Sequence, residues 1–279
     1  MSALDALPPL RDVIRRHGLS ADKAFSQNYL LDGNLLARIA RAAGPLDGRH
    51  VLEVGPGPGG LTRALLASGA KVTAVERDRR FYPALDELAA AADGRLSILQ
   101  DDALAIDEAR LDGPLTVVAN LPYTIATVLW FKWLDRLDLF EGFTLLFQRE
   151  VAERLTARPG GKAYGRLAVK SQRLARVHRL FDIPARAFVP PPKVTSTLIG
   201  AVPLPAPLCE ADAHALDRVL TAAFGQRRKM LRVSLRALGF DPAAMMERAG
   251  VAPTERPESL DIAAFCRLAG ALQAMTAAS

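Results

Sequence analysis

A glycine-rich turn between an apolar strand and a helix is the feature that most limits the fold of this chain. Residues 50–54 predict a buried strand, and residues 61–67 predict the helix that follows it. The turn between them, residues 55–60, consists of four glycines and two prolines. Glycine allows a tight turn and a close approach of the backbone to a ligand, and a helix N-terminus offers unpaired N–H groups. The segment therefore predicts a ligand-binding βα unit.

Strands and helices continue to alternate after this unit. We expect helices at 34–43, 80–92 and 125–137, and strands at 71–76, 95–100, 115–119, 143–148, 177–183 and 195–202. This order is typical of βαβ units and predicts an α/β fold with a mostly parallel, Rossmann-like sheet. Two prolines near residue 204 mark a linker, and helices follow from residue 211. We expect an N-terminal arm (1–24), a catalytic domain (25–204) and a helical, RNA-binding domain (205–279).

Polar residues or glycine stand where four of the predicted strands end: Gly55, Glu76, Asp102 and Asn120. The carboxyl ends of parallel strands form the edge of the sheet at which ligands bind. Glu76 stands 21 residues after Gly55, where a carboxylate accepts hydrogen bonds from ribose hydroxyls. Asp101 and Asp102 could accept a hydrogen bond from the exocyclic amine of adenine, or could be solvated loop charges.

An NAD-binding enzyme is the first alternative, because Gly55, Gly57 and Gly60 satisfy the dinucleotide fingerprint. Pro56 and Pro58, however, carry no N–H group and weaken a pyrophosphate site. A carboxylate at the second strand would also repel the 2′-phosphate of NADP. A ligand that combines a nucleoside with an amino acid fits this turn better.

The stretch Asn120-Leu121-Pro122-Tyr123 follows a short buried strand, and its chemistry is specific. The amide oxygen of Asn120 and a backbone carbonyl, which we assign to Leu121, could accept both N–H groups of an exocyclic amine. Tyr123 could stack on the ring of such a base. Alternatively, Asn120 caps the next helix and Tyr123 is an ordinary core residue.

Basic residues are concentrated in the second half of the chain. Residues 1–148 hold 16 Lys and Arg against 19 Asp and Glu, whereas residues 149–279 hold 20 against 11. Such an imbalance indicates a polyanionic partner, although an arginine-rich solvated surface would have the same composition. Nine basic residues lie in 149–179, Arg173 among them, and five lie in 227–236. As contacts to RNA phosphates we predict Arg149, Lys162, Arg166, Arg227, Arg228 and Lys229.

Several classes of protein are disfavoured by what the sequence lacks. The first ten residues do not resemble a signal peptide, and no apolar stretch approaches the length of a membrane span. Cys209 and Cys266 have no histidine near them, which argues against zinc and against a disulfide framework and suits a reducing cytoplasm. The four histidines form no cluster, so we expect no metal. We expect a cytoplasmic monomer.

Taken together, the motifs resemble the small-subunit ribosomal RNA adenine dimethyltransferase family. They lie at 27–30, 53–57, 76, 102–103, 120–123, 148–152, 162–167, 188–194 and 224–229. The chain departs from the family at Ser26, where a glycine is usual in the segment that covers the cofactor.

This resemblance implies an S-adenosylmethionine-dependent enzyme that dimethylates N6 of two adjacent adenosines near the 3′ end of small-subunit (16S) RNA, within the 30S precursor. The target base must leave its stack to react. The resemblance also implies a role for each site residue. The cofactor would bind Asn28, Leu30, Gly55, Gly57, Glu76, Asp102 and Asn120, and the target adenine would bind Asn120, Leu121, Tyr123 and Phe188.

In this assignment Asn28 and Leu30 contact the methionine part of the cofactor, and Tyr123 and Phe188 sandwich the target adenine. Three alternatives stay open. A related family methylates an adenine of large-subunit RNA, although residues 190–194 and 226–229 favour the small-subunit family. A DNA adenine methyltransferase would more often have proline in place of Leu121. The protein could also be chiefly an RNA-binding assembly factor without essential catalysis.

Overall fold

The computed structural model of the chain describes residues 3–4, 6–21 and 27–278, so Ser26 and the end of the N-terminal arm lie outside the described residues. Contacts between Cα atoms divide the chain into two units. Unit 1 comprises residues 1–152 and 178–203, and unit 2 comprises residues 153–177 and 204–279. The grouping places residues 153–177 with the helices of unit 2. Which segments fold independently is a separate question, so the predicted domain boundaries stay a prediction.

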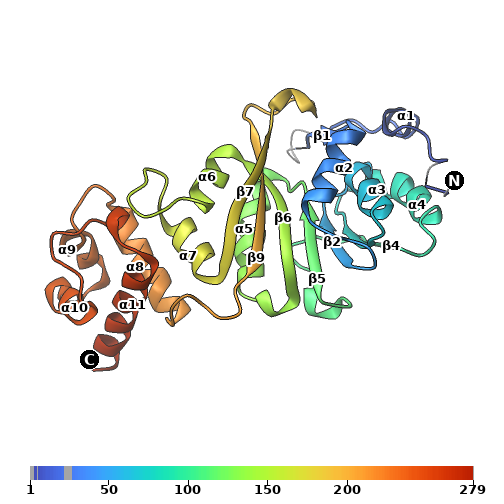
Figure 1. Cartoon of the computed structure of the whole chain (residues 1–279). Helices are drawn as coiled ribbons and strands as arrows, with labels where there is room; N and C mark the ends of the chain where they lie inside the picture. The colour runs from blue at the N-terminus through green and yellow to red at the C-terminus, as the bar shows by residue number, and fades with distance from the viewer. Residues whose placement is uncertain (1–2, 5, 22–26, 279) are drawn as a thin grey trace. The chain divides into compact units, whose positions relative to one another are not determined.

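A seven-stranded sheet is the centre of unit 1 (Figure 1). Its strands are β2 (His50–Val54), β3 (Lys71–Val75), β4 (Leu96–Leu99), β5 (Leu115–Ala119), β6 (Phe140–Gln148), β7 (Ala175–Ile183) and β9 (Ser196–Pro203). Their order is β4-β3-β2-β5-β6-β9-β7. The pairs β2–β3, β2–β5, β3–β4 and β5–β6 are parallel, and β6–β9 is antiparallel. The predicted α/β class and mostly parallel sheet are confirmed.

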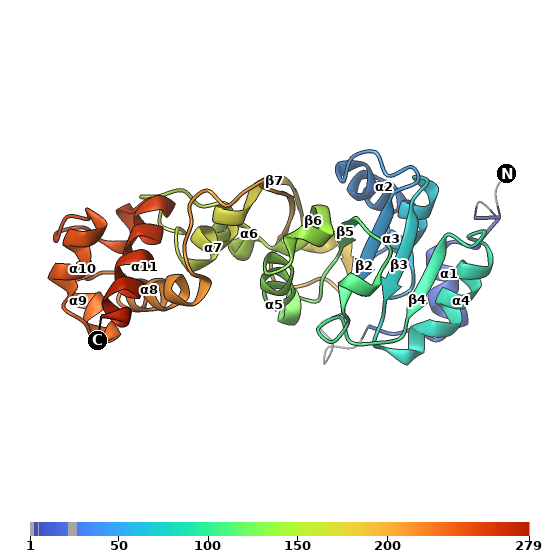
Figure 2. The same cartoon turned by 90° about the horizontal axis from the view of Figure 1, so that it is seen from below.

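The helices of this part of the chain follow the strands as the sequence pattern predicts. They are α1 (Leu10–Arg16), α2 (Gly33–Ala42), α3 (Gly60–Ala67), α4 (Tyr82–Ala90), α5 (Tyr123–Leu134) and α6 (Arg149–Leu155). Helix α4 starts later than predicted because residues 79–81 form a 3-10 turn, which Asp78 caps by accepting from the N–H of Arg80. Figure 2 shows α1 beside α4, where Val13 packs against Phe81 and Leu85.

Apolar side chains alternate between the two faces of the sheet, as expected for strands covered on both sides. On one face, Val51, Val72 and Val118 share a buried cluster with residues of α2 and α3. On the other face, Phe143 of β6 packs edge-on against Trp130 of α5, with ring centroids 5.2 Å apart. Layers of this kind bury the strands and leave their carboxyl ends as the accessible edge.

A second, two-stranded sheet joins β1 (Tyr29–Leu30) to β8 (Phe188–Val189). The strands are antiparallel, with Leu30 opposite Phe188 and Tyr29 opposite Val189. The sequence analysis did not predict this pairing, because two-residue strands show no periodicity. The pairing brings the motif at 27–30 beside the motif at 188–194.

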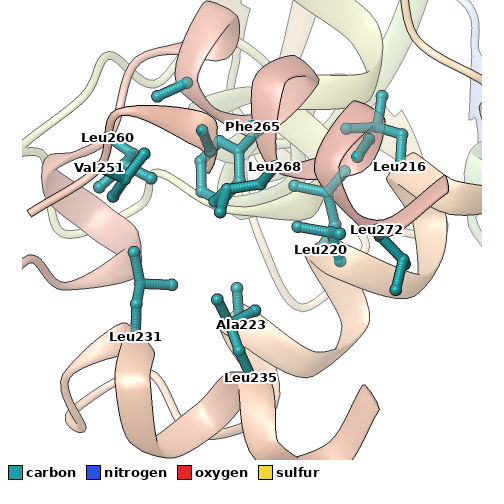
Figure 3. Packing of buried hydrophobic residues seen from close by; sticks show 14 of the residues in the cluster. Leu216, Leu220, Ala223, Leu231, Leu235, Val251, Leu260, Phe265, Leu268 and Leu272 are labelled. Atoms are coloured by element: carbon teal, nitrogen blue, oxygen red, sulfur yellow. The ribbon is translucent and has the colours of Figure 1, made fainter. Parts of the chain in front are cut away.

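The helices of unit 2 surround a core of their own. They are α7 (Arg166–Leu174), α8 (Ala213–Gly225), α9 (Leu231–Ser234), α10 (Pro242–Ala249) and α11 (Ile262–Ala277). Figure 3 shows Leu216 and Leu220 of α8 and Phe265, Leu268 and Leu272 of α11 in one buried cluster. Among the residues that the structure describes, no helix is both long and apolar enough to span a membrane.

The two cysteines differ from the expectation. Cys209 and Cys266, separated by 57 residues, form a disulfide with a Cα–Cα distance of 6.3 Å. The sequence argued against a disulfide framework because the two residues are far apart along the chain. Cys266 lies on α11, however, and folding brings that helix beside the segment that precedes α8. Separation along a chain does not determine distance in space.

Candidate functional site

A cavity of about 420 Å³ opens in unit 1 at the carboxyl ends of β2, β3 and β5. All the residues that the sequence predicted to bind a cofactor line it, and Leu121 and Tyr123 line it as well. Its wall includes Gln27, Asn28, Tyr29, Leu30, Glu53, Gly55, Pro56, Gly57, Glu76, Arg77, Asp78, Asp101, Asp102, Ala103, Leu104, Asn120, Leu121, Pro122 and Tyr123. Motifs that lie far apart in the sequence therefore form one site.

The glycine-rich turn needs its glycines for conformation and for space. Gly55 has φ +70° and Gly57 has φ +53°, in the left-handed region that glycine adopts at little cost. A Cβ atom on Gly55 would lie 3.6 Å from the ring of Pro122, and one on Gly57 would lie 3.7 Å from the ring of Tyr29. The turn thus runs between the two polar segments that carry Asn120 and Asn28.

Glu76 is fixed at the end of β3 by two backbone donors. One carboxylate oxygen accepts from the N–H of Gly57 at 3.1 Å, and the other accepts from the N–H of Asp78 at 2.8 Å. The residue is 8 % exposed, and burial raises the pKa of its carboxyl while the hydrogen bonds from Asp78 and Gly57 lower it. Each oxygen retains a lone pair that could accept from a ligand hydroxyl.

Glu53 is a buried carboxyl group that the sequence analysis placed in a motif without giving it a role. It is 1 % exposed, and its Oε2 atom has no hydrogen-bond partner among the described residues. Burial raises the pKa of Glu53 to about 8, and the nearby Glu76 raises it further. An unpartnered oxygen in a cavity wall is suited to a ligand group with N–H donors.

Asp102 lies on the loop after β4. One of its carboxylate oxygens accepts from the N–H of Leu104 at 2.9 Å, and the other pairs with Arg77 at 3.0 Å. The Arg77 side chain is 70 % exposed, so this ion pair contributes little stability. Asp101 accepts from the N–H of Asp102 at 2.7 Å and thus orders the turn. The sequence missed Arg77, which follows Glu76 without any motif of its own.

Asn120 is oriented by the backbone of a segment 92 residues away. Its Nδ2 atom donates to the carbonyl of Asn28 at 3.3 Å, which turns the amide oxygen away from that carbonyl. The carbonyl of Pro122 accepts from the N–H groups of Ile125 and Ala126 in the first turn of α5. Leu121, 1 % exposed, is followed by that turn and contributes its backbone to the cavity.

Tyr123 is the first residue of α5, and its phenolic oxygen lies 2.5 Å from the Oγ atom of Ser196 in β9. Burial raises the pKa of the Tyr123 hydroxyl, so the ring is neutral near pH 7. Ser196 is fully buried. The sequence analysis did not identify this partner, because a serine in a strand carries no recognisable signal.

Phe188 lies elsewhere in unit 1. It is 2 % exposed, belongs to the cluster that contains Leu30 and Leu36, and does not line the cavity. Its backbone is nevertheless paired with Leu30, whose side chain and neighbours do line the cavity. The role predicted for Phe188 at the target base stays a prediction.

The six predicted RNA contacts fall into both units. Arg149 belongs to unit 1, where it lies 4.0 Å from Asp182, and the other five belong to unit 2. In unit 2, Arg166 pairs with Asp217 at 3.4 Å, and Arg227 donates to the carbonyl of Gly161 at 3.1 Å. The remaining three, Lys162, Arg228 and Lys229, are exposed.

Arg173 departs from the expected basic stripe. It is 8 % exposed and donates to the backbone carbonyls of Cys209 and Ala211 at 3.0 and 3.1 Å. Its charge therefore holds the start of the helical segment in place, and the expectation that it faces a polyanion is wrong. Within residues 3–4, 6–21 and 27–278, no group of three or more His, Cys, Asp or Glu could hold a metal ion.

Comparisons with known proteins cover nearly the whole chain. The family described as "Ribosomal RNA adenine dimethylase" matches residues 18–274. The chain is 57 % identical over 277 residues to "Ribosomal RNA small subunit methyltransferase A" of Azorhizobium caulinodans, covering 97 % of this chain and 95 % of that protein. It is 52 % identical over 279 residues to the protein of that name from Paracoccus denitrificans, covering 98 % and 99 %.

Solved structures give the same fold. A dimethyladenosine transferase from Plasmodium falciparum has a TM-score of 0.74 and 25 % identity, covering 85 % of this chain and 94 % of that one. The 23S rRNA methyltransferase ErmE has a TM-score of 0.67 and 27 % identity, covering 88 % of this chain and 100 % of that one.

Proposed function

Because the chain belongs to the ribosomal RNA adenine dimethylase family, we propose that it dimethylates N6 of two adjacent adenosines near the 3′ end of small-subunit (16S) RNA. The family expected from the sequence is confirmed, and the chain is an S-adenosylmethionine-dependent rRNA methyltransferase. ErmE shares the fold at 27 % identity, whereas the curated small-subunit enzymes reach 57 %. This difference favours the small-subunit substrate over the large-subunit one.

The observation that carries the proposal is the hydrogen bond between Asn120 and Asn28, because it joins the predicted base-binding and cofactor-binding segments at one cavity. The oriented amide oxygen of Asn120 would accept one N–H of the adenine amine. Since the first turn of α5 uses the carbonyl of Pro122, the carbonyl of Leu121 is the natural acceptor for the second. Tyr123 would stack on the ring.

The residues of the cavity fit S-adenosylmethionine part by part. Glu76 would accept from the ribose hydroxyls, and Asp102 from the adenine amine. Asn28 and Leu30 would contact the methionine part, and the unpartnered Oε2 of Glu53 would accept from its ammonium group. When bound, the cofactor supplies an electrophilic methyl group on its sulfonium. The chain itself contributes position and electrostatics, because two acceptors on the amine hydrogens leave its lone pair directed at the methyl carbon.

The substrate within this proposal is the small-subunit RNA of the 30S precursor, recognised by a monomer in the cytoplasm. Exposed basic residues on both units would contact phosphates without reading sequence. The six predicted contacts are Arg149, Lys162, Arg166, Arg227, Arg228 and Lys229. An assembly factor without essential catalysis would need the same basic surface, but it would not need the polar cavity.

A methyl-transfer assay tests the proposal. The protein is incubated with labelled S-adenosylmethionine and with small subunits from cells that lack this modification, and the labelled nucleotides are mapped by mass spectrometry. We expect dimethyladenosine at two adjacent positions near the 3′ end. Label in large-subunit RNA, or in no RNA, would refute the proposed substrate.

The Asn120→Ala variant tests the site in the same assay. We expect the rate of transfer to fall on the order of 10²–10³-fold, because a preorganised acceptor is lost, while binding of RNA is retained. Asn34→Ala on the exposed side of α2 is the matched control and should keep the wild-type rate. An unchanged rate for Asn120→Ala would remove Asn120 from the mechanism.

A further inference from the structure

Lys132 is the only charged residue of helix α5, and all three of its N–H donors are used. Its Nζ atom donates to the carbonyl of Ala103 at 3.0 Å, to the carbonyl of Ile106 at 2.6 Å and to the carboxylate of Glu108 at 2.9 Å. All three acceptors lie in the segment that follows β4. A single side chain on α5 therefore holds this segment from the side.

The acceptor Glu108 is itself fixed. Its side chain is 7 % exposed, and the same oxygen that binds Lys132 accepts from the Nε1 atom of Trp133 at 2.8 Å. The Lys132 side chain is 27 % exposed, so water competes little for its ammonium group. Removing one member of a buried charge pair leaves the other without compensation, which makes the contact costly to lose.

The segment that Lys132 holds is the Asp102 loop, which we define as residues 101–107. It contains neither helix nor strand, and Asp102, Ala103 and Leu104 line the cavity. Within the loop, the N–H groups of Ala105 and Ile106 both point to the carbonyl of Asp102. The position of the Asp102 carboxylate therefore depends on the course of this backbone.

We propose that Lys132 is a positioning residue that holds the Asp102 loop where Asp102 recognises the adenine of the cofactor. The inference rests on the proposed role of Asp102. The carbonyls of Ala103 and Ile106 converge on one ammonium group and fix the curvature of the loop. The exposed ion pair with Arg77 cannot replace this restraint, because it is screened by water.

The test compares Lys132→Met with the wild type, using S-adenosylhomocysteine and its 6-oxo analogue S-inosylhomocysteine as probes. A carboxylate placed at the purine 6-position accepts from an amine and repels an oxygen. We expect Lys132→Met to lower the affinity for S-adenosylhomocysteine about tenfold and to narrow its preference over the 6-oxo analogue. In turnover, the KM for S-adenosylmethionine should rise about tenfold while kcat stays within about twofold.

Hydrogen exchange gives a readout that does not depend on the function of the site. In the free protein, Lys132→Met should speed the exchange of the amides of residues 103–107, whereas the amides of β2 and β5 should keep their wild-type protection. Lys71→Met, at the exposed start of β3, is the matched control and should change neither exchange nor affinity. Lys132→Gln is the second variant if Lys132→Met does not fold.

Asp102→Ala separates the two levels of the argument. If this variant keeps the full preference for the amino purine, the proposed role of Asp102 fails, and the exchange experiment alone decides whether Lys132 holds the loop. If Asp102→Ala loses the preference but a folded Lys132 variant keeps it, the positioning role of Lys132 is overturned. Equal loss of affinity for both probes in the Lys132 variant would overturn it as well.

Discussion

The hydroxyl groups of Tyr123 and Ser196 lie 2.5 Å apart, although the two residues are separated by 73 positions in the sequence. Tyr123 begins α5 directly after the Asn120 motif, and Ser196 begins β9. The bond prevents the Tyr123 ring from turning about its side-chain axis relative to the sheet. Ser196 therefore determines which face of the ring is presented to the cavity.

Removing this bond should slow methyl transfer without weakening cofactor binding. We expect Ser196→Ala and Tyr123→Phe each to lower kcat about tenfold, since each removes one buried hydrogen bond. The double variant should be no slower than either single variant, because the same interaction is lost only once. Ser97→Ala, exposed on β4, is the control. Additive effects in the double variant would show that the two hydroxyls act separately.

Glu76→Gln should weaken cofactor binding strongly. The carboxylate accepts from the N–H groups of both Gly57 and Asp78, and an amide can satisfy only one of them through its oxygen. We expect the Kd for S-adenosylmethionine, measured by calorimetry, to rise by about tenfold or more. Asp86→Asn, exposed on α4, should leave the Kd unchanged. Equal Kd values for Glu76→Gln and the wild type would exclude Glu76 from the ribose site.

Glu53 predicts a specific dependence of stability on pH in the free protein. Its pKa is raised from an ordinary value of 4.5 to about 8, so the folded state holds a proton that the unfolded state releases between these two values. The free energy of unfolding must therefore fall as the pH rises from 4.5 to 8, by up to about 1.4 kcal/mol per pH unit from this group. Below pH 4.5 and above pH 8 the contribution is constant.

Glu53→Gln has no such proton to lose and tests the assignment. Its free energy of unfolding, relative to the wild type, should increase steadily through the interval in which Glu53 is protonated only in the folded state. Urea unfolding at a series of pH values measures the difference. A difference that does not change with pH would mean that Glu53 titrates normally in the folded protein.

The basic residues at 227–229 should contribute to RNA binding through charge. Each phosphate contact adds to the dependence of affinity on salt, so replacing all three by alanine should reduce the slope of log K against log salt by about two units. Arg228 and Lys229 are exposed and should account for most of this change. Three exposed arginines of unit 1 provide the control: Arg41, Arg110 and Arg136. A slope equal to that of the wild type would rule out phosphate contacts at 227–229.

Short-range patterns predicted the sheet and the residues at its carboxyl edge. Glu76, Asp102 and Asn120 could be found from sequence because each stands where an apolar strand stops, and parallel strands bring such positions together. Lys132 and Ser196 could not be found in this way. Lys132 interrupts an apolar helix and Ser196 lies within a strand, so their importance depends on partners that only tertiary packing supplies.

Charge and cysteine counts were the least reliable guides, because they ignore where a side chain points. Arg173 counts toward a basic stripe but is buried against backbone carbonyls. Cys209 and Cys266 are distant in sequence but are joined within unit 2. The two-residue pairing of Leu30 with Phe188 is likewise too short to leave a periodic pattern.

That short pairing of β1 with β8 also limits how the two segments can change in length. Side chains alternate along a strand, so an insertion or deletion of one residue beside Leu30 or Phe188 would reverse which side chain faces the core. Leu30 and Phe188 are both buried, and neither reversal could be absorbed without disturbing the other strand. The two motifs can accept substitutions independently, but they must keep their lengths in step.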